Sequence, residues 1–239
     1  YVSKTAKWAD STKSETSVPD SFQEFGEMPI ERQGRRNDLD DLYCMIKEGY
    51  SNYQILEMMP ESILNIDKLD KVRQTIVQEK FRNSCRFLDV TYLWGDTGVG
   101  KTRSIMEQYG YSNVYRVTDY YHPFDSYQGQ DVIVFEEFRS GFLIRDMLNY
   151  LDIYPLELPC RYLNKVACYT KVYIVSNIPL RQQYSNVQRE EPETWLALLR
   201  RIKDVKHYTK LGVENQRIKI DENGFWRIVS IGVESRYDG

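Results

Sequence analysis

Residues 95–102 read Gly95-Asp96-Thr97-Gly98-Val99-Gly100-Lys101-Thr102. This stretch fits the pattern G-x-x-x-x-G-K-[ST] of the P-loop, which binds nucleotide phosphates. Glycines let the backbone approach the phosphates, and the N–H groups at the start of the following helix bind them. The pattern assigns the Lys101 ammonium to the β- and γ-phosphates and the Thr102 hydroxyl to Mg²⁺. The alternative is a glycine-rich turn that leads into a helix and binds nothing.

The residues on both sides of the loop have the strand–loop–helix order that the motif requires. Apolar and β-branched residues from Leu88 to Trp94 predict a strand, and residues from Lys101 to Tyr109 predict a helix. The alternation continues, and it predicts strands over Val114–Val117, Val132–Phe135 and Val172–Val175 and helices over Phe142–Leu151 and Glu193–Ile202. Because such near-continuous apolar strands are typical of a buried parallel sheet, we predict an α/β fold with a P-loop core.

The composition is that of a globular domain. Of the 239 residues, 41% are hydrophobic and 28% are charged, and the formal net charge of −3 neither indicates nor excludes a nucleic-acid partner. No apolar run is long enough to span a bilayer and no signal-peptide pattern is present, so we expect no membrane partner. The four cysteines show no C-x-x-C spacing, which argues against a zinc site and fits a reduced, cytosolic compartment.

Upstream of the α/β region, residues 37–83 have the pattern of a small helical bundle. Asn37 is placed to begin a first helix, and Gly49 is placed to end it. Ser51 followed by Gln54 matches a capping box, which predicts the start of a second helix. After Pro60, an apolar stripe at helical spacing predicts a third helix, and its members are Ile63, Ile66, Leu69, Val72 and Ile76. Such a bundle can stand alone or present a face to a neighbouring subunit. Near the other end of the chain, the turn signal of residues 221–224 lies between the predicted strands Arg217–Ile220 and Phe225–Val229, which together predict a β-hairpin.

Polar side chains follow two of the predicted strands at their carboxyl ends. Glu136 and Glu137 come directly after one strand, and Asn177 follows a later one. Because ligands of an open α/β sheet bind at this edge, the two acids are candidates for the catalytic pair of a nucleotide hydrolase. We assign Glu136 to the Mg²⁺ shell and Glu137 to the general base, although these two roles can be reversed. Asn177 is a candidate for orienting water or contacting the γ-phosphate, and its alternative is a turn-forming asparagine.

Two further stretches carry basic side chains. The helix predicted over residues 193–202 ends with Arg200 and Arg201, which favour an arginine finger that reaches a nucleotide on an adjacent subunit. Ordinary arginines at a helix carboxyl terminus are the alternative. A loop upstream of Asn177 mixes basic, aromatic and amide side chains. This mix suits single-stranded nucleic acid, because cations pair with the phosphate backbone and aromatic rings stack on the bases. The candidate residues are Arg161, Tyr162, Asn164 and Lys165. The alternative for this loop is an ordinary exposed loop.

Together, these motifs resemble those of the replication initiator (Rep) proteins of circular single-stranded DNA viruses and related bacterial plasmids. The helicase domain of these proteins belongs to superfamily 3. The resemblance runs from Tyr1 to Ile202, which is most of the chain. Its motifs are Walker A at 95–102, an aromatic–Asp–x–Tyr–x–Gly stretch at 124–130, Walker B at 132–138, motif C at 176–177 and the arginine-finger helix at 198–202. The Walker B segment has Glu-Glu where viral members often have Asp-Asp.

The opening residues Tyr1-Val2-Ser3-Lys4 resemble the Y-x-x-K motif that ends the family's HUH endonuclease domain. In that domain, the tyrosine attacks a DNA phosphate and becomes joined to the 5′ end, with the help of a metal-bound histidine pair. The resemblance therefore implies that Tyr1 is the nicking nucleophile of a longer parent protein. It also implies that the present chain does not nick DNA. A tyrosine that stands there by accident is the alternative.

The resemblance implies an AAA+-like superfamily 3 ATPase that forms a homo-oligomer, expected to be a hexamer, uses ATP and Mg²⁺, and moves 3′ to 5′ along single-stranded DNA. The P-loop pattern alone does not choose between ATP and GTP. Four parts are expected: a nuclease remnant and linker over 1–36, oligomerisation helices over 37–83, the ATPase over 84–206 and a β-hairpin extension over 207–239. The Glu-Glu variant looks more like bacterial plasmid members, which places the chain in the bacterial cytoplasm. A viral member would act in the host nucleus.

Two other functions remain open on the sequence. A monomeric P-loop kinase would use residues 95–102 but needs neither the paired acids nor an arginine from a second subunit. A DNA-binding module that nucleotide merely stabilises would keep all of these motifs without unwinding DNA. Activity that is independent of protein concentration and of DNA would favour the kinase. Glu137→Gln separates the hydrolase from the passive module, because loss of hydrolysis with retained ATP and DNA binding supports catalysis.

Overall fold

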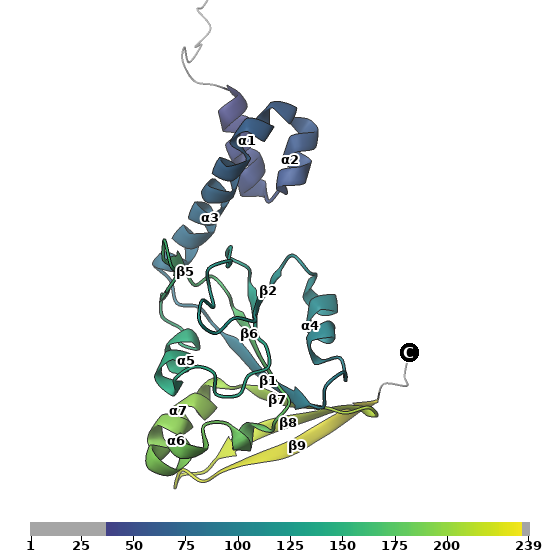
Figure 1. Cartoon of the computed structure of the whole chain (residues 1–239), viewed down its shortest axis with the longest axis vertical. Helices are drawn as coiled ribbons and strands as arrows, with labels where there is room; N and C mark the ends of the chain where they lie inside the picture. Colours follow the sequence, from purple (N-terminus) through teal and green to yellow (C-terminus); the bar gives the residue numbers. More distant parts are fainter. Residues whose placement is uncertain (1–36, 236–239) are drawn as a thin grey trace, which may run out of the picture. The chain divides into compact units, whose positions relative to one another are not determined.

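The computed structural model describes residues 37–235 of the chain (Figure 1). Tyr1 lies outside the described residues, so its role stays a prediction. Residues up to Cys44 and from Met45 onward form two units, and the packing described below is that of the second. In chain order, the elements are α1 (Asn37–Glu48), α2 (Asn52–Met58), the 3₁₀ helix η3 (Pro60–Asn65), α3 (Ile66–Arg82), β1 (Asp89–Gly95), α4 (Lys101–Tyr109), β2 (Val114–Val117), β3 (Val132–Phe135), α5 (Ile144–Tyr150), β4 (Glu157–Leu158), β5 (Lys165–Val166), β6 (Lys171–Ser176), the 3₁₀ helix η4 (Leu180–Gln182), α6 (Ser185–Glu190), α7 (Pro192–Arg201), β7 (Asp204–Tyr208), β8 (Gly212–Ile220) and β9 (Trp226–Ser235).

A seven-stranded sheet in the order β2-β3-β6-β1-β7-β8-β9 forms the centre of the second unit. The strands from β2 to β7 in this order run parallel, whereas β8 and β9 are antiparallel to their neighbours. Strands β1 and β6 stay in register up to Trp94 opposite Ser176. The P-loop and the residues that follow β6 therefore leave the sheet at the same edge. These features confirm the predicted α/β fold with a mostly parallel sheet.

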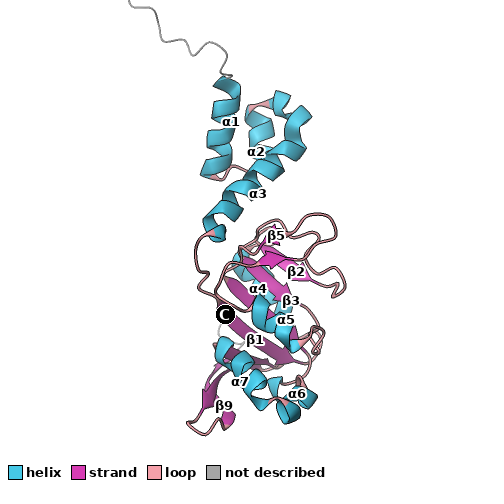
Figure 2. Ribbon diagram, turned by 90° about the vertical axis from the view of Figure 1, so that its left-hand side faces the viewer, coloured by secondary structure: helices cyan, strands magenta, loops and turns pink. Residues whose placement is uncertain are grey.

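Buried apolar side chains form one cluster on each face of the sheet, and Figure 2 shows helices α5 and α7 against its strands. On one face, Met147 of α5 and Trp195 of α7 belong to the same buried cluster as Phe135 of β3. On the other face, Ile105 of α4 packs in a cluster with Leu93 of β1. Burial on both sides explains why the strands of this sheet are continuous apolar runs.

Most predicted elements have nearly their predicted bounds, but strand β7 was missed. Strands β2 and β3 and helix α4 have the predicted bounds, and β1, β6, α5 and α7 differ by one or two residues at their ends. Strand β7 pairs in parallel with β1. Its five residues include only two buried apolar side chains, those of Val205 and Tyr208. Its charged residues therefore hide the strand from a search for apolar runs.

The helices before the sheet follow the predicted pattern with one difference. The capping box is confirmed, since the Gln54 N–H donates to Ser51 Oγ at 3.2 Å and the Ser51 N–H donates to Gln54 Oε1 at 2.8 Å. Pro60 begins η3, which contains Ile63, so the predicted stripe is divided between η3 and α3. Leu69 of that stripe is buried, whereas Ile63 is 63% exposed. Within residues 37–235, no helix has the length and apolar character needed to cross a membrane.

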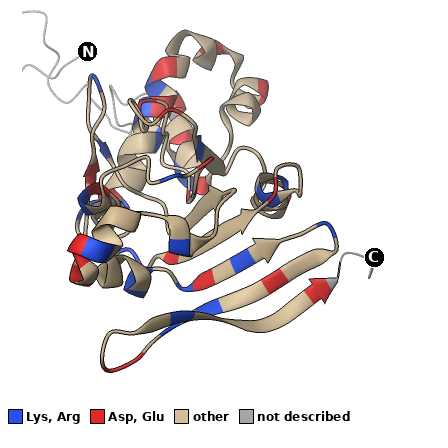
Figure 3. Cartoon of the chain, turned by 60° about the horizontal axis from the view of Figure 1, so that its bottom comes forward, with Lys and Arg blue, Asp and Glu red and all other residues tan. Residues whose placement is uncertain are grey.

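The predicted hairpin is present as β8 and β9, which are longer than the sequence indicates. Asp221 Oδ1 closes the turn by accepting hydrogen bonds from the N–H groups of Asn223 at 2.9 Å and Phe225 at 2.8 Å. Basic and acidic residues are interspersed along β7, β8 and β9 (Figure 3). This part of the sheet therefore carries mixed charge.

Candidate functional site

Two glycines shape the loop between β1 and α4. Gly95 ends β1 at a φ of +143°, and a β-carbon there would collide with the Tyr208 carbonyl oxygen. Gly100 precedes α4 with a left-handed φ of +82°, which residues with a side chain rarely adopt. The first N–H groups of α4 have no acceptor within the helix. The loop thus presents a helix N-terminus at the carboxyl edge of the sheet, where anions bind.

The Lys101 side chain is folded into this loop. It is only 6% exposed. Its ammonium donates to the carbonyl oxygens of Gly95 at 2.6 Å and Asp96 at 2.8 Å and to Asn177 Oδ1 at 3.0 Å. Burial lowers the pKa of Lys101, and the charge of Glu137 is the largest effect opposing it. The lysine therefore connects the P-loop with Asn177 at the end of β6, as expected if both belong to one site.

Glu136 contacts the P-loop threonine and an arginine of the neighbouring strand. Glu136 Oε2 accepts a hydrogen bond from Thr102 Oγ1 at 2.9 Å, and Oε1 accepts one from Arg116 Nε at 2.7 Å. The hydroxyl of Tyr120 donates to the Glu136 carbonyl oxygen at 2.7 Å. Sequence reasoning does not find Arg116 or Tyr120, because neither belongs to a local motif. Arg116 reaches the acid because β2 pairs in parallel with β3.

Glu137 faces a different partner. Asn177 Nδ2 donates to Glu137 Oε2 at 2.7 Å, while the Oδ1 of the same amide accepts from Lys101. The φ of Glu137 is +49°, a left-handed conformation that costs a residue with a side chain about 1–2 kcal/mol. Backbone strain of this kind is found mainly at functional sites. The two predicted acids are thus divided, with Glu136 on the threonine and Glu137 on the asparagine.

A buried glutamine ties together the chain segments that carry these residues. The Nε2 of Gln183 lies within hydrogen-bond distance of the Tyr92 hydroxyl (2.8 Å), the Phe138 carbonyl oxygen (2.9 Å) and Ser176 Oγ (3.2 Å). The Tyr92 hydroxyl donates in turn to the Ile178 carbonyl oxygen at 2.8 Å, and burial raises the pKa of Tyr92 to about 12. This network fixes the turn after the two acids to the end of β6. No local sequence pattern predicts a role for Gln183, which lies in the loop after η4.

The arrangement fits a nucleotide held with Mg²⁺. The Thr102 hydroxyl and the Glu136 carboxylate meet at 2.9 Å, and oxygen atoms are the ligands that Mg²⁺ prefers. Lys101 and the N-terminus of α4 supply positive charge beside them, where phosphates would lie. The structure therefore brings together residues 95–102, Glu136, Glu137 and Asn177 at one sheet edge.

Arg200 and Arg201 lie at the other edge of the sheet. Both end α7, and the next strand, β7, runs alongside β1 in the same direction. The seven residues of β1 separate the two edges by about 20 Å. Arg201 forms an ion pair with Asp152 at 3.1 Å and donates to a carbonyl oxygen of its own helix. The Arg200 side chain is exposed and forms no hydrogen bond or ion pair with any residue from 37 to 235.

The predicted DNA-binding residues form a separate group in the hairpin between β4 and β5. Tyr162 is 95% exposed at its tip. Arg161 forms an ion pair with Asp125, and Lys165 Nζ donates to the Asp125 carbonyl oxygen at 2.6 Å. Asn164 Oδ1 accepts a hydrogen bond from a backbone N–H of the same hairpin at 3.4 Å. Two of these four side chains are thus engaged with Asp125, a contact that the sequence does not predict.

Comparisons with known proteins agree with these motifs. The RNA helicase family model matches residues 91–177, from β1 to the asparagine after β6. The replication-associated protein of canary circovirus is 24% identical over 191 residues, which are 77% of this chain and 60% of the relative. That of goose circovirus is 30% identical over 128 residues, covering 53% of this chain and 42% of the relative. That of beak and feather disease virus is 29% identical over 107 residues, covering 45% and 32%.

The chain thus spans 60% or less of the length of these three curated relatives. The relatives come from animal circoviruses, so the preference for a bacterial plasmid and the bacterial cytoplasm stay predictions. The segment matched by the helicase model contains the P-loop, the two acids and Asn177, which the structure places at one edge of the sheet. The chain is therefore similar to the replication-associated (Rep) proteins of circoviruses, and its residues 91–177 match the helicase family model.

Proposed function

We propose that the chain is the ATP-driven helicase module of a rolling-circle replication initiator. The observation that carries this proposal is the pair of contacts at the carboxyl edge of the sheet. One joins Thr102 to Glu136, and the other joins Lys101 to Glu137 through Asn177.

Lys101 and the N–H groups of the loop would bind the phosphates of ATP, and Thr102 and Glu136 would hold Mg²⁺. When bound, Mg²⁺ would neutralise negative charge on the phosphate oxygens. The contact of Glu136 with Arg116 keeps the carboxylate turned toward Thr102. Arg116 is therefore a positioning residue in this proposal.

Glu137 would act as the general base. It accepts a proton from water as the water oxygen bonds to the γ-phosphorus, and the bond from that phosphorus to the β–γ bridging oxygen breaks, which releases ADP and phosphate. Asn177 would orient the base and the water through its amide. Lys101 would leave its carbonyl partners for the phosphates, and the Asn177 contact keeps it within reach.

We further propose that the arginine finger is Arg200, supplied by the neighbouring subunit. Arg200 is exposed and without a partner among residues 37–235, whereas Arg201 is held by Asp152. Its position at the amino edge of the sheet keeps it from the P-loop of its own chain, so a second subunit is required. Exposed apolar side chains in η3 support subunit contact, since Ile63 is 63% and Leu64 is 86% exposed. A hexamer and the oligomerisation role of residues 37–83 are part of the proposal.

Single-stranded DNA is the proposed partner, bound in a central channel by the β4–β5 hairpin and moved 3′ to 5′. The nicking role of Tyr1 in a longer protein and the four-part division at residues 36, 83 and 206 remain part of the same proposal. A strand-displacement assay tests it directly. The proposal predicts that the chain separates a duplex with a 3′ single-stranded tail only when ATP and Mg²⁺ are present. Equal displacement with ADP, or displacement from a 5′ tail alone, would contradict it.

A further inference from the structure

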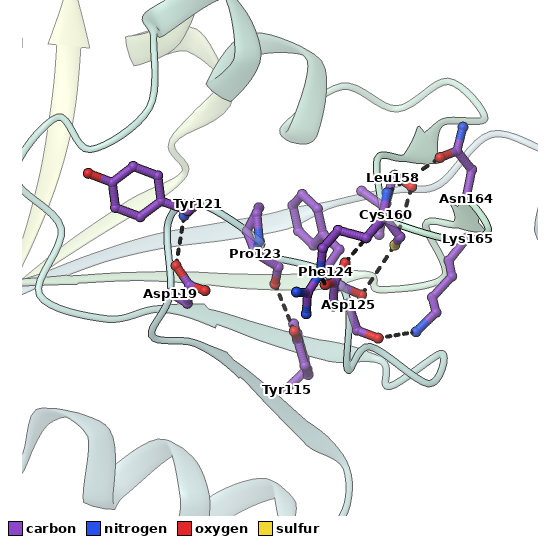
Figure 4. Close-up of polar contacts among 11 residues, drawn as sticks. Tyr115, Asp119, Tyr121, Pro123, Phe124, Asp125, Leu158, Cys160, Asn164 and Lys165 are labelled. Atoms are coloured by element: carbon purple, nitrogen blue, oxygen red, sulfur yellow. Dashed lines mark hydrogen bonds and ion pairs between the residues drawn. The ribbon is translucent and has the colours of Figure 1, made fainter.

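Asp125 makes three contacts with the hairpin between β4 and β5. Its carboxylate accepts hydrogen bonds from the Arg161 N–H at 3.0 Å and from Arg161 Nε. Its carbonyl oxygen accepts a hydrogen bond from Lys165 Nζ at 2.6 Å. Figure 4 shows Lys165 extended toward Asp125, with Cys160 beside them. One residue thus binds both sides of the hairpin, at the start and at the end of its tip.

The segment that carries Asp125 is itself firmly held. Phe124 is completely buried, and its carbonyl oxygen accepts a hydrogen bond from Cys160 Sγ at 3.4 Å. The Tyr115 hydroxyl donates to the Pro123 carbonyl oxygen at 2.7 Å (Figure 4). Asp125 therefore projects from a fixed point of the core. The backbone N–H of Arg161 has the largest lowering effect on the pKa of Asp125, and the hydrogen bond from the Arg161 side chain has the next largest. The Asp125 carboxylate therefore stays charged at neutral pH.

The tip of the hairpin is left open by these contacts. Tyr162 is 95% exposed and Leu163 is 78% exposed, whereas Arg161 and Lys165 point back to Asp125. An arginine whose guanidinium already binds a carboxylate cannot also neutralise a phosphate at full strength. An exposed tyrosine ring, by contrast, offers a face on which a base can stack.

We propose that Asp125 is a positioning residue that fixes this hairpin through Arg161 and Lys165, and that Tyr162 is its contact with the bases of single-stranded DNA. This division of roles rests on the proposed function. It adds that base stacking on Tyr162 is the mode of DNA recognition at the tip of the hairpin. It also separates two residues that build the hairpin from one that meets the ligand.

The test measures the affinity of the full chain for a labelled oligothymidylate at several salt concentrations, with a non-hydrolysable ATP analogue present. The variant Tyr162→Ala is expected to bind about 5-fold to about 100-fold more weakly, the range for loss of one stacked base. The salt dependence of its affinity is expected to equal that of the wild type, because no charge is removed. Tyr162→Phe keeps the ring and is expected to bind as the wild type does.

Asp125→Asn gives the sharper result. If Asp125 merely opposed DNA by its charge, removing that charge would strengthen binding. A positioning role predicts the opposite, namely weaker binding, with no further loss in the double variant Asp125→Asn/Arg161→Gln. Glu190→Gln removes a matched charge from the exposed pair with Arg189 and is expected to leave DNA affinity unchanged. A thermal melt of each variant shows that it is folded before its affinity is compared.

Three results would overturn the inference. The first is wild-type affinity in Tyr162→Ala, and the second is tighter binding in Asp125→Asn. The third is a drop of about 0.7 in the salt slope of Arg161→Gln, which marks a lost phosphate contact on a single strand. A wild-type chain that binds no oligothymidylate at all would overturn the proposed function as well, so the two failures are distinguishable.

Discussion

Asn177 Nδ2 donates a 2.7 Å hydrogen bond to Glu137 Oε2, across the carboxyl ends of β6 and β3. The two residues meet because β3 and β6 are parallel neighbours with Phe135 opposite Ile174, so that both strands end at the same edge of the sheet. The same amide accepts a hydrogen bond from Lys101. A single asparagine therefore connects the side chain proposed to bind phosphate with the side chain proposed to accept a proton.

The variant Glu137→Gln keeps the hydrogen-bonding shape at this position but cannot accept a proton. We expect its rate of ATP hydrolysis to fall between about 10²-fold and about 10⁴-fold, as loss of a general base does. Its affinity for ATP should stay near that of the wild type, because the P-loop is untouched. Single-turnover hydrolysis together with equilibrium binding of a labelled nucleotide measures the two effects. Unchanged turnover would remove Glu137 from the chemistry and favour a nucleotide-stabilised binding module.

Arg116→Gln should weaken Mg²⁺ binding rather than nucleotide binding as such. Arg116 holds the Glu136 carboxylate toward Thr102, and losing a group that orients a metal ligand typically lowers metal affinity about 10-fold to 100-fold. The Mg²⁺ concentration that gives half-maximal ATP hydrolysis measures this. Arg189→Gln, which removes an arginine from an exposed ion pair elsewhere, is the matched control. Equal Mg²⁺ requirements in all three proteins would contradict the positioning role.

The two arginines of α7 should have different effects. Arg200→Ala is expected to reduce ATP hydrolysis by about 10³-fold or more, as loss of an arginine finger does, without lowering the melting temperature. Arg201→Ala breaks the half-buried pair with Asp152 and should cost about 1 kcal/mol of unfolding free energy. In an equal mixture of Arg200→Ala and Lys101→Ala subunits, an interface is intact when an intact Lys101 on one subunit meets an intact Arg200 on the next. Activity should therefore return at roughly a quarter of the interfaces of a symmetric ring. No recovery on mixing would argue against an arginine supplied by a neighbour.

Tyr92 should make the fold sensitive to alkaline pH. Burial raises its pKa to about 12 in the folded chain, above the value of about 10 in an unfolded chain. The protonated hydroxyl is therefore favoured by folding, and its contribution is fully present below pH 10 and lost as the pH rises to about 12. Over that range the loss amounts to about 3 kcal/mol. Urea unfolding at several pH values should show a steeper alkaline decline for the wild type than for Tyr92→Phe; parallel curves would contradict the assignment.

The parts of the site that the sequence predicts are those whose signal is local. The P-loop, the acid pair and Asn177 each follow an apolar run, and the ends of parallel strands place such residues at one edge. Arg116 and Gln183 give no local signal, and the 124–130 stretch that contains Asp125 does not indicate what its carboxylate contacts. Several of their contacts join residues 20 or more positions apart, such as Arg116 with Glu136 and Asp125 with Arg161. Such pairs depend on strand order and loop packing, which periodicity does not encode.

Strand β7 shows a related limit. It runs between β1 and β8 in the sheet, yet its sequence from Asp204 to Tyr208 is largely charged and polar. Its neighbour β8 is antiparallel to it and partly exposed, so β7 is not buried on both faces as β1 is. Strand β7 therefore lacks the apolar run by which central strands are recognised, although it lies inside the sheet.

The most direct test of the central claim is the rate of ATP hydrolysis per subunit, measured over a range of protein concentrations with and without single-stranded DNA. A DNA-driven ring with its ATP sites between subunits predicts a rate that rises steeply with concentration and rises further when DNA is added. A rate that is independent of concentration and indifferent to DNA would contradict the ring motor and favour a monomeric kinase or a passive binding module.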